Sequence, residues 1–413
     1  MKAVGIIAEY NPLHNGHIYH MNMARKLSGT DAVVVAMSGN YVQRGEPAIF
    51  DKWTRTEHAL AGGADLVVEI PVLFCLGDAG KYASAGVSLL ESTGAVSHVA
   101  FGSECGDTDF LISIADDFNN NADEIASEIL SLRSLGLSYP AARERAFVNV
   151  ISEIRGTEPD YDPYIQKAGK LFNSSNDILA LEYVMSLRKA KPLAVKRAGA
   201  GYDDPYDIKF EYQSASAVRK QFFDGRDMKK YVPECTWKDL MSKHATGTGI
   251  DKWFDTLRYA VLSTPEEVIE DCPSGGEGLA NLMKKEIKNA KDWESFAQRV
   301  HSKRYTYSRI SRLCMQVLLG ITRSKYPVDP PGYIRVLGFN EKGRLLLAEM
   351  KSGQTSELPV ITNINKESDK PDPAAKTLLE LDKYASDIYN LMCGRDLLAE
   401  SDAVHRPVMF MPE

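Results

Sequence analysis

A strand, a tight turn and a helix at the start of this 413-residue chain constrain its fold most. The apolar run Ala3–Ala8 predicts a buried strand, and Ile18–Leu27 carries apolar residues at helical spacing. His14 and His17 lie in the turn between them, where unpaired N–H groups and the helix dipole favour phosphate. Imidazoles can stabilise charge that develops on a phosphoryl oxygen, and Gly16 lets the backbone approach a ligand. The turn therefore predicts a nucleotide site.

Strands and helices alternate over the first hundred residues. After the first helix, we expect strands at Ala32–Met37, Leu66–Ile70 and Ser97–Phe101, and helices at Lys52–Ala61 and Lys81–Ser92. Single helices between strands predict right-handed crossovers and an α/β, doubly wound parallel sheet. Ligands bind beyond the carboxyl ends of such strands, where the loops Glu9–His17, Ser38–Pro47 and Gly102–Glu104 are expected to meet. Gly102 is either a ligand contact or a plain turn glycine, and the long polar loop Ser38–Lys52 either binds ligand or is merely solvated.

The pattern changes after the fourth strand. Helices at Phe110–Leu135, interrupted near Asn120, and at Pro140–Ile154 predict a helical insertion at about residues 106–170. A capped helix at Ile178–Leu187 and a strand at Pro192–Lys196 then give the sheet a fifth strand, which runs into the loop Lys196–Tyr202.

Two hydroxyl groups and an arginine mark the start of the next helix. Ser216 and Arg219 in Gln213–Lys220 could hold the outer phosphates of a nucleotide and neutralise leaving pyrophosphate. The alternative is a serine that caps a helix without any ligand. We expect one catalytic domain over residues 1–225 and a mainly helical C-terminal domain over 226–413, with a small hairpin within Tyr333–Glu349 and loops over Gly353–Lys370.

Charge and composition limit the kinds of partner that this chain is expected to bind. The chain carries a net charge of -7, but the runs Met185–Ala198 and His301–Tyr326 contain no acidic residue. Basic residues interleaved with tyrosines suit RNA contact, although each run could be a solvated helix face. The candidate RNA-binding residues are Lys196, Lys303, Arg304, Arg309 and Arg312. Six scattered cysteines, no signal peptide and no long apolar run predict a cytoplasmic protein without a membrane or DNA partner.

The order of these motifs resembles a known family. A strand, His-x-Gly-His and a helix are similar to the signature of the nucleotidyltransferase superfamily. The longer match resembles the bacterial tRNA(Met) cytidine acetate ligase family, through Gly5–His17, Ser38–Ala48, Ala64–Pro71, Phe101–Glu104, Asn176–Leu179 and Lys196–Arg197. The likeness covers most of the chain and is strongest over the first 105 residues.

The resemblance implies a reaction and a set of site residues. The family activates acetate with ATP as acetyl-adenylate, then acetylates N4 of the wobble cytidine of elongator tRNA(Met), without acetyl-CoA. Mg²⁺ is expected with ATP, and no metal ligand is predicted. The implied ATP site comprises Ile7, Ala8, Glu9, Tyr10, Asn11, Pro12, Leu13, His14, Asn15, Gly16, His17, Ile18, Tyr19, His20, Gly102, Asn176 and Arg197. The residues expected to act in catalysis are His14, His17, Ser216 and Arg219.

One departure and two alternatives accompany this reading. The pair expected as Asn-Asn before Ile178 is Asn176-Asp177 here, so only Asn176 is carried over. A small-molecule nucleotidyltransferase would explain the nucleotide site but not the basic runs. A non-catalytic RNA-binding protein would predict a broken first motif, whereas both histidines are present.

Overall fold

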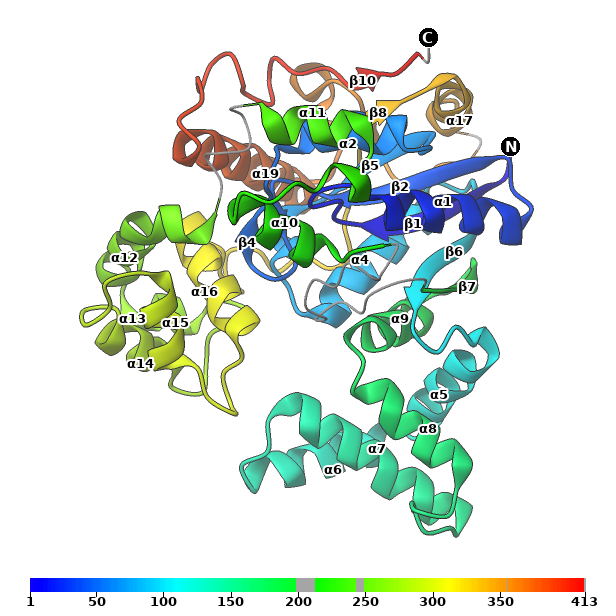
Figure 1. Cartoon of the computed structure of the whole chain (residues 1–413), viewed down its shortest axis with the longest axis vertical. Coiled ribbons are helices and arrows are strands. Elements are labelled where there is room, and N and C mark those ends of the chain that lie inside the picture. The colour runs from blue at the N-terminus through cyan, green and yellow to red at the C-terminus, as the bar shows by residue number, and fades with distance from the viewer. Residues whose placement is uncertain (198–211, 243–248, 354, 412–413) are drawn as a thin grey trace.

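The central sheet combines strands from both ends of the chain (Figure 1). The computed structural model describes residues 1–197, 212–242, 249–353 and 355–411. Within these ranges, eight strands share one sheet in the order β10-β8-β5-β2-β1-β6-β7, with β9 beside β8. They are β1 (Ala3–Ala8), β2 (Ala32–Ser38), β5 (Leu66–Ile70), β6 (Val96–Ser103), β7 (Lys191–Lys196), β8 (Ile334–Phe339), β9 (Val360–Ile361) and β10 (Val408–Met409). All pairs are parallel except β5 with β8, so the predicted α/β class with a parallel sheet is confirmed.

Helices cover both faces of this sheet because its strands are apolar on both sides. Successive side chains of a strand point to opposite faces, and every residue of β2 is buried. Val34 belongs to the core that includes α4 (Ala79–Ser92), whereas Val35 belongs to the core beneath α1 (Asn15–Ser28) and α2 (Lys52–Ala61). The predicted bounds of α2 and β5 are confirmed residue for residue.

The fourth and fifth strands are separated by the helical insertion, which we define as α5–α8. The helices of this segment are α5 (Thr108–Asn120), α6 (Ala122–Ser134), α7 (Tyr139–Arg155), α8 (Pro163–Phe172) and the adjoining α9 (Ser175–Ser186). Phe147 stacks on Phe118 with ring centroids 4.8 Å apart and packs against Phe172. The insertion therefore has its own apolar core, below the sheet in Figure 1. The sequence did not predict α8 as a helix.

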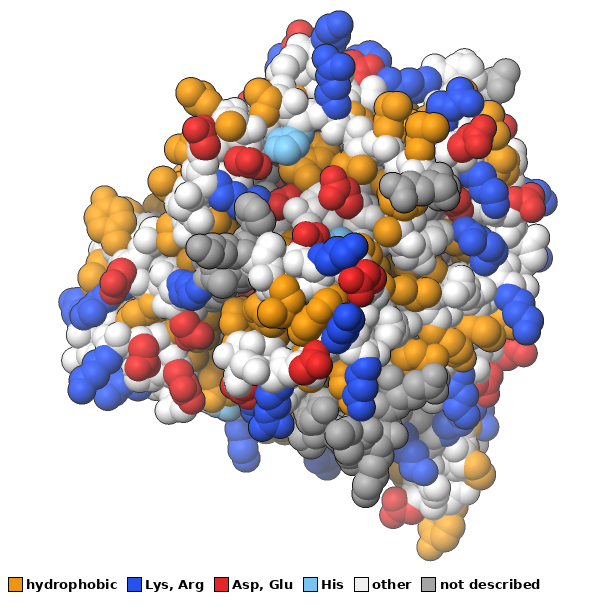
Figure 2. Space-filling view, turned by 45° about the horizontal axis from the view of Figure 1, so that its top comes forward, with side chains coloured by type: hydrophobic (Ala, Val, Ile, Leu, Met, Phe, Trp, Pro, Cys, Tyr) orange, Lys and Arg blue, Asp and Glu red, His pale blue; other side chains and the backbone are white. Residues whose placement is uncertain are grey.

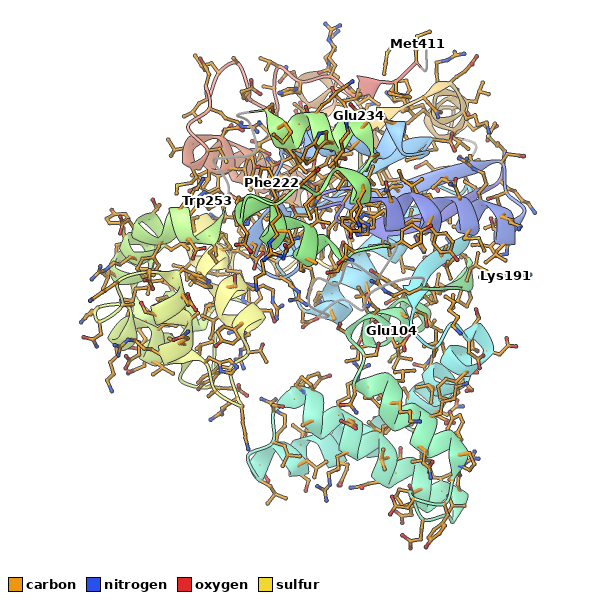
Figure 3. All side chains as sticks on the ribbon, viewed as in Figure 1. Glu104, Lys191, Phe222, Glu234, Trp253 and Met411 are labelled. Atoms are coloured by element: carbon orange, nitrogen blue, oxygen red, sulfur yellow. The ribbon has the colours of Figure 1, made fainter. Side chains whose placement is uncertain are left out.

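The C-terminal region is mostly helical, as predicted. Its elements are α10 (Ala215–Phe223), η1 (Lys229–Tyr231), α11 (Glu234–Met241), η3 (Ile250–Trp253), α12 (Phe254–Ser263), α13 (Glu266–Glu270), α14 (Leu279–Glu286), α15 (Trp293–Val300), α16 (Tyr307–Leu319), α17 (Glu341–Lys351), α18 (Ile364–Glu367) and α19 (Pro373–Met392). Helices α12–α16 form a second unit, which we call the C-terminal bundle. Buried Trp253 lies where this bundle meets the rest of the protein. Its ring centroid is 6.0 Å from the ring centroids of both Tyr41 and Tyr389 (Figure 3).

Three expectations about the C-terminal region are wrong. The expected hairpin within Tyr333–Glu349 is β8 followed by α17, and β8 joins the central sheet. The expected loop Gly353–Lys370 contains β9 and α18. The region is also not wholly separate, because β8, β9 and β10 lie in the sheet of the N-terminal half. The proposed boundary at residue 225 stays a prediction.

Close packing explains why β8 contains a glycine, Gly338, in the stretch expected to form a hairpin. A Cβ added to Gly338 would lie 2.5 Å from Cγ2 of Thr56, so this residue marks a close approach of α2 and not a turn. Residues 198–202 of the predicted loop Lys196–Tyr202 lie outside the described residues. No helix in the described part of the chain is both long and apolar enough to cross a membrane.

Candidate active site

The two motif histidines form one stacked pair at the start of α1. Tyr10, with φ of 46°, and the cis bond before Pro12 turn the chain out of β1, and His14 then caps the helix in extended conformation. The backbone N–H of His14 donates to Nδ1 of His17 at 3.2 Å, and the two rings stack with centroids 3.6 Å apart. Because Nδ1 of His17 accepts this bond, its Nε2 is left as the donor. A donor at a helix start suits a phosphate oxygen.

Burial keeps the histidines of this turn neutral. It lowers the pKa of His14 to about 3 and that of His20 to about 4, and the Arg197 charge lowers both further. Burial also lowers the pKa of His17 well below its usual value, and the neighbouring His14 adds to this effect. Uncharged imidazoles can act here as hydrogen-bond donors and acceptors, and they need no counter-charge.

Polar atoms without partners point to a ligand at the turn. Among the described residues, Nδ1 of His14, Nε2 of His20 and the hydroxyl of Tyr10 are buried and have no hydrogen-bond partner. Buried polar atoms are normally satisfied, so these three atoms mark where a bound molecule would complete the bonding. Gly16 serves the His14 ring directly, since an added Cβ would lie 3.0 Å from its Nδ1.

Arg219 joins the second predicted motif to the histidine turn. Ser214 caps α10 by accepting a bond from the N–H of Ala217 at 3.1 Å. From the next turn of this helix, Nη1 of Arg219 donates to the carbonyl oxygen of Asn11 at 2.5 Å. Ser216 lies half-buried in the first turn of α10. The structure therefore brings the two motifs together, while the phosphate roles of Ser216 and Arg219 stay predictions.

Gly102, Asn176 and Arg197 also meet at the carboxyl edge of the sheet. Nη1 of Arg197 donates to Oδ1 of Asn176 at 3.4 Å, and a Cβ at Gly102 would lie 3.5 Å from Cγ of Arg197. Nδ2 of Asn176 donates to Glu104, which follows β6 and is labelled in Figure 3. These residues lie together beside His14, whose pKa the Arg197 charge lowers.

The departure at residue 177 has a physical reason. Oδ1 of Asp177 accepts from the hydroxyl of Ser103 at 2.6 Å and from the N–H of Glu104 at 2.9 Å, while its Oδ2 accepts from the N–H of Cys105 at 3.2 Å. Only donors face this side chain in these contacts, so a carboxylate fits where an amide NH₂ would oppose another donor. Asp177 supports the turn after β6 and is not itself expected to contact nucleotide.

Several residues of the Ile7–His20 segment pack within the protein. Leu13 is fully buried in the core beneath α1, and Ile7 packs against Gly86 of α4. Nδ2 of Asn15 donates to the carbonyl of Lys230 at 3.0 Å, and the ring of Tyr19 lies 5.5 Å from that of Tyr212. The nucleotide roles of these four residues stay predictions, and for Leu13 only its backbone is available.

Sequence reasoning missed the residue that holds the site loops together. Arg55 is fully buried in α2 and donates to the carbonyl of Glu9 at 2.7 Å, that of Ser38 at 3.0 Å and that of Phe50 at 3.0 Å. Oε1 of Glu9 in turn accepts from the N–H of Gln43 at 2.9 Å. The signal was present, because a charged residue on the inner face of an amphipathic helix is seldom buried without such partners.

The predicted RNA-binding residues fall into two groups. Arg309 donates to the carbonyls of Ser274 at 3.0 Å and Gly275 at 3.1 Å, and burial lowers its pKa. Burial lowers the pKa of Arg312 to about 10, and its Nη1 donates to the carbonyl of Gln43 at 3.3 Å. Lys196, Lys303 and Arg304 are exposed. The basic run is therefore partly internal, and RNA contact by these five residues stays a prediction.

The fold and the stacked histidine turn define a nucleotidyltransferase. A family profile described as HIGH Nucleotidyl Transferase matches residues 1–402. The tRNA(Met) cytidine acetate ligase of Clostridium perfringens is 36% identical over 99% of this chain and 100% of its own length. That of Fervidobacterium nodosum is 37% identical over 97% of this chain and 93% of its own length. This chain belongs to the tRNA(Met) cytidine acetate ligase family.

Solved structures agree with this assignment. The crystal structure of Thermotoga maritima TmcAL without ligand matches with a TM-score of 0.90 and 32% identity, over 99% of this chain and 100% of the other. The same protein bound with alpha-thio ATP matches with a TM-score of 0.88 at the same identity and coverage.

Proposed function

We propose that this protein activates acetate with ATP and transfers the acetyl group to N4 of the wobble cytidine of elongator tRNA(Met). The observation that carries the proposal is the end-to-end similarity to curated tRNA(Met) cytidine acetate ligases in a chain whose His14–His17 turn is intact. ATP as a substrate is further supported by the related structure bound with alpha-thio ATP.

In the first step, a carboxylate oxygen of acetate attacks the α-phosphorus of ATP. The new O–P bond forms as the bond to pyrophosphate breaks, and acetyl-adenylate results. Acetate is already ionised near pH 7, so this step needs positioning and charge stabilisation but no base. Neutral His14 and His17 donate hydrogen bonds to the phosphate oxygens, while Ser216 and Arg219 hold the departing pyrophosphate.

In the second step, N4 of cytidine attacks the acetyl carbonyl and AMP leaves. The N–C bond forms, the C–O bond to the phosphate breaks, and N4 loses one proton. The mixed anhydride hydrolyses readily, so the site must exclude water until RNA is bound. The carboxylate of Glu9 lies beside the histidine turn, and burial raises its pKa, which suits a group that accepts this proton.

The proposed reaction has consequences for the metal and for the acetyl donor. No group of three or more His, Cys, Asp or Glu side chains in the described ranges could hold a metal. Mg²⁺ would then enter with the phosphates of ATP and supply charge neutralisation to the leaving pyrophosphate. Acetyl-CoA has no part in the proposed reaction.

Pyrophosphate exchange tests the proposal directly. The purified protein, ATP and labelled pyrophosphate, without RNA, should show exchange that depends on acetate. Formate and propionate serve as matched acids of smaller and larger size. Mass spectrometry of the tRNA nucleosides should then show N4-acetylcytidine only when acetate, ATP and elongator tRNA(Met) are all present. Exchange that ignores acetate, or acetylation that requires acetyl-CoA, would refute the assignment.

A further inference from the structure

A cleft of about 1610 Å³ separates the helical insertion from the C-terminal bundle. Residues of α6, α7 and α9 line one side, and residues 273–277 with the start of α16 line the other. The two helical units face each other across this opening in Figure 1. Gln43 also lines the cleft, and its N–H donates to Oε1 of Glu9 in the candidate active site. This hydrogen bond links the cleft wall to the candidate active site.

The lining of this cleft is cationic, although the whole chain is acidic. Seven basic side chains line it, against four acidic ones, in a chain of net charge -7. The basic residues are Lys81, Arg133, Arg143, Arg304, Arg309, Arg312 and Arg323. On the face shown in Figure 2, basic and acidic side chains are interspersed, so that face is not generally positive. A cleft of this kind suits an anionic polymer.

One acidic residue in the cleft differs from the others. The carboxylate of Glu277 pairs with Arg133 of α6, with Arg309 at 2.6 Å and with Arg304 at 3.6 Å. Among the described residues of the cleft, Glu182 forms an ion pair with one arginine, Arg143, and Asp329 forms an ion pair with one lysine, Lys81. Glu277 thus gathers three arginines from both sides of the opening. Several guanidinium groups around one anion are typical of a phosphate site.

The backbone of Glu277, which lines the cleft, has an unusual conformation. Its φ is 62°, in the left-handed region, and it lies between Gly276 and Gly278, whose φ values are 92° and 80°. This region is disfavoured for a residue with a Cβ, which glycine lacks. Tyr305 holds the segment by donating its hydroxyl to the Glu277 carbonyl. A strained residue held in place at a ligand cleft is commonly functional.

We infer that this cleft receives the single-stranded loop of the RNA substrate, and that Glu277 occupies the place of a phosphate until RNA enters. The inference rests on the proposed function. A phosphate of the incoming loop replaces the Glu277 carboxylate as the partner of the three arginines, and the ion pair between Arg133 and Glu277 breaks. Tyr139, which is 53% exposed in the cleft wall, offers a face on which an unpaired base can stack.

Glu277→Gln tests this inference because it removes the charge and keeps the shape. We expect it to bind an unmodified elongator tRNA(Met) transcript about threefold or more tighter than wild type at about 0.1 M salt. The salt slope should steepen by about 0.7 for each arginine released to RNA. The matched control is Glu357→Gln, which removes an exposed acid paired with Lys189 outside the cleft. Unchanged or weaker binding by a folded Glu277→Gln protein would overturn the inference.

A second variant keeps the test decisive if Glu277→Gln does not fold. Arg133→Gln should weaken RNA binding and make the salt slope shallower by about 0.7, because one phosphate contact is lost. Its control is Arg155→Gln, another arginine of the insertion, paired with Asp162 outside the cleft. Equal binding by Arg133→Gln and wild type would overturn the inference. A wild-type protein that binds no tRNA would instead refute the proposed function.

Discussion

The guanidinium of Arg219 donates to the carbonyl of Asn11 at 2.5 Å, although 208 residues separate them along the chain. This bond ties α10 to the turn that carries His14 and His17. The same arginine lies 3.7 Å from the carboxylate of Glu46 in the hairpin of β3 (Tyr41–Val42) and β4 (Glu46–Pro47). One side chain therefore connects α10 to the histidine turn and to the β3–β4 hairpin.

Arg219→Lys should lower acetate-dependent pyrophosphate exchange by more than about tenfold, because a lysine cannot bridge two partners with a planar fork. The midpoint of thermal unfolding should change little, since Arg219 is partly exposed. Lys220→Arg, on the solvent side of the same helix, is the matched control. Exchange near the wild-type rate in Arg219→Lys would show that this arginine has no role in adenylation.

His17→Ala should reduce adenylation on the order of 100-fold, as for loss of one donor that stabilises developing charge. His98→Ala is the control, because His98 lies on β6 at the opposite end of the strand from Gly102. Exchange rates and far-ultraviolet circular dichroism of both variants give the comparison. A folded His17→Ala protein with normal exchange would mean that the stacked pair is structural.

Gly16→Ala tests the fit between the turn and the His14 ring. Alanine favours helix, but its Cβ would lie 3.0 Å from Nδ1 and Cε1 of His14, so the ring must move and adenylation should fall. Gly169→Ala is the control, since an added Cβ there meets no described atom within 4 Å. That variant should gain about 0.5–1 kcal/mol of stability in denaturant unfolding and keep full activity. Equal activity of the two variants would contradict the proposed fit.

The neutral histidines predict a loss of stability in acid. Their pKa values are lower in the folded chain than in the unfolded chain, so the unfolded state binds more protons as pH falls below about 6.5. The free energy of unfolding should therefore decrease from pH 6.5 towards pH 4, where His20 begins to titrate in the folded state. Urea unfolding across this pH range should show that the free energy of unfolding decreases less steeply for His20→Asn than for the wild-type protein. The same slope in both proteins would refute the prediction.

Glu9→Gln should separate the two half-reactions. Glutamine keeps an oxygen that can accept from the N–H of Gln43, so the loop and the adenylation step should be preserved. Transfer to tRNA should slow by about 10²–10⁴-fold, as for loss of a general base. Single-turnover transfer from preformed acetyl-adenylate, measured across pH, gives the result. Unchanged transfer would assign the proton to another acceptor, and lost exchange would place Glu9 in ATP binding.

Local sequence patterns determined those helices and strands that are specified by their own residues. The apolar run of β1, the Asp51 cap of α2 and the apolar run of β5 each specify an element from its own residues. The histidine turn follows in the same way, because a strand, a break and a helix start fix where the unpaired N–H groups lie. For this reason the parallel sheet and the first half of the site could be predicted from sequence.

Only the tertiary structure decided which distant groups became partners. Strand β8 pairs with β5 across more than 260 residues, and the side chain of Arg55 binds three carbonyl groups from two site loops. Arg309 turns inward to Ser274, while Arg304 stays exposed. A charged residue on a helix reads the same in sequence whether its partner is water, a carbonyl or a phosphate. The partner depends on which surfaces meet when the chain closes, and burial then sets the pKa and the hydrogen bonding of the group.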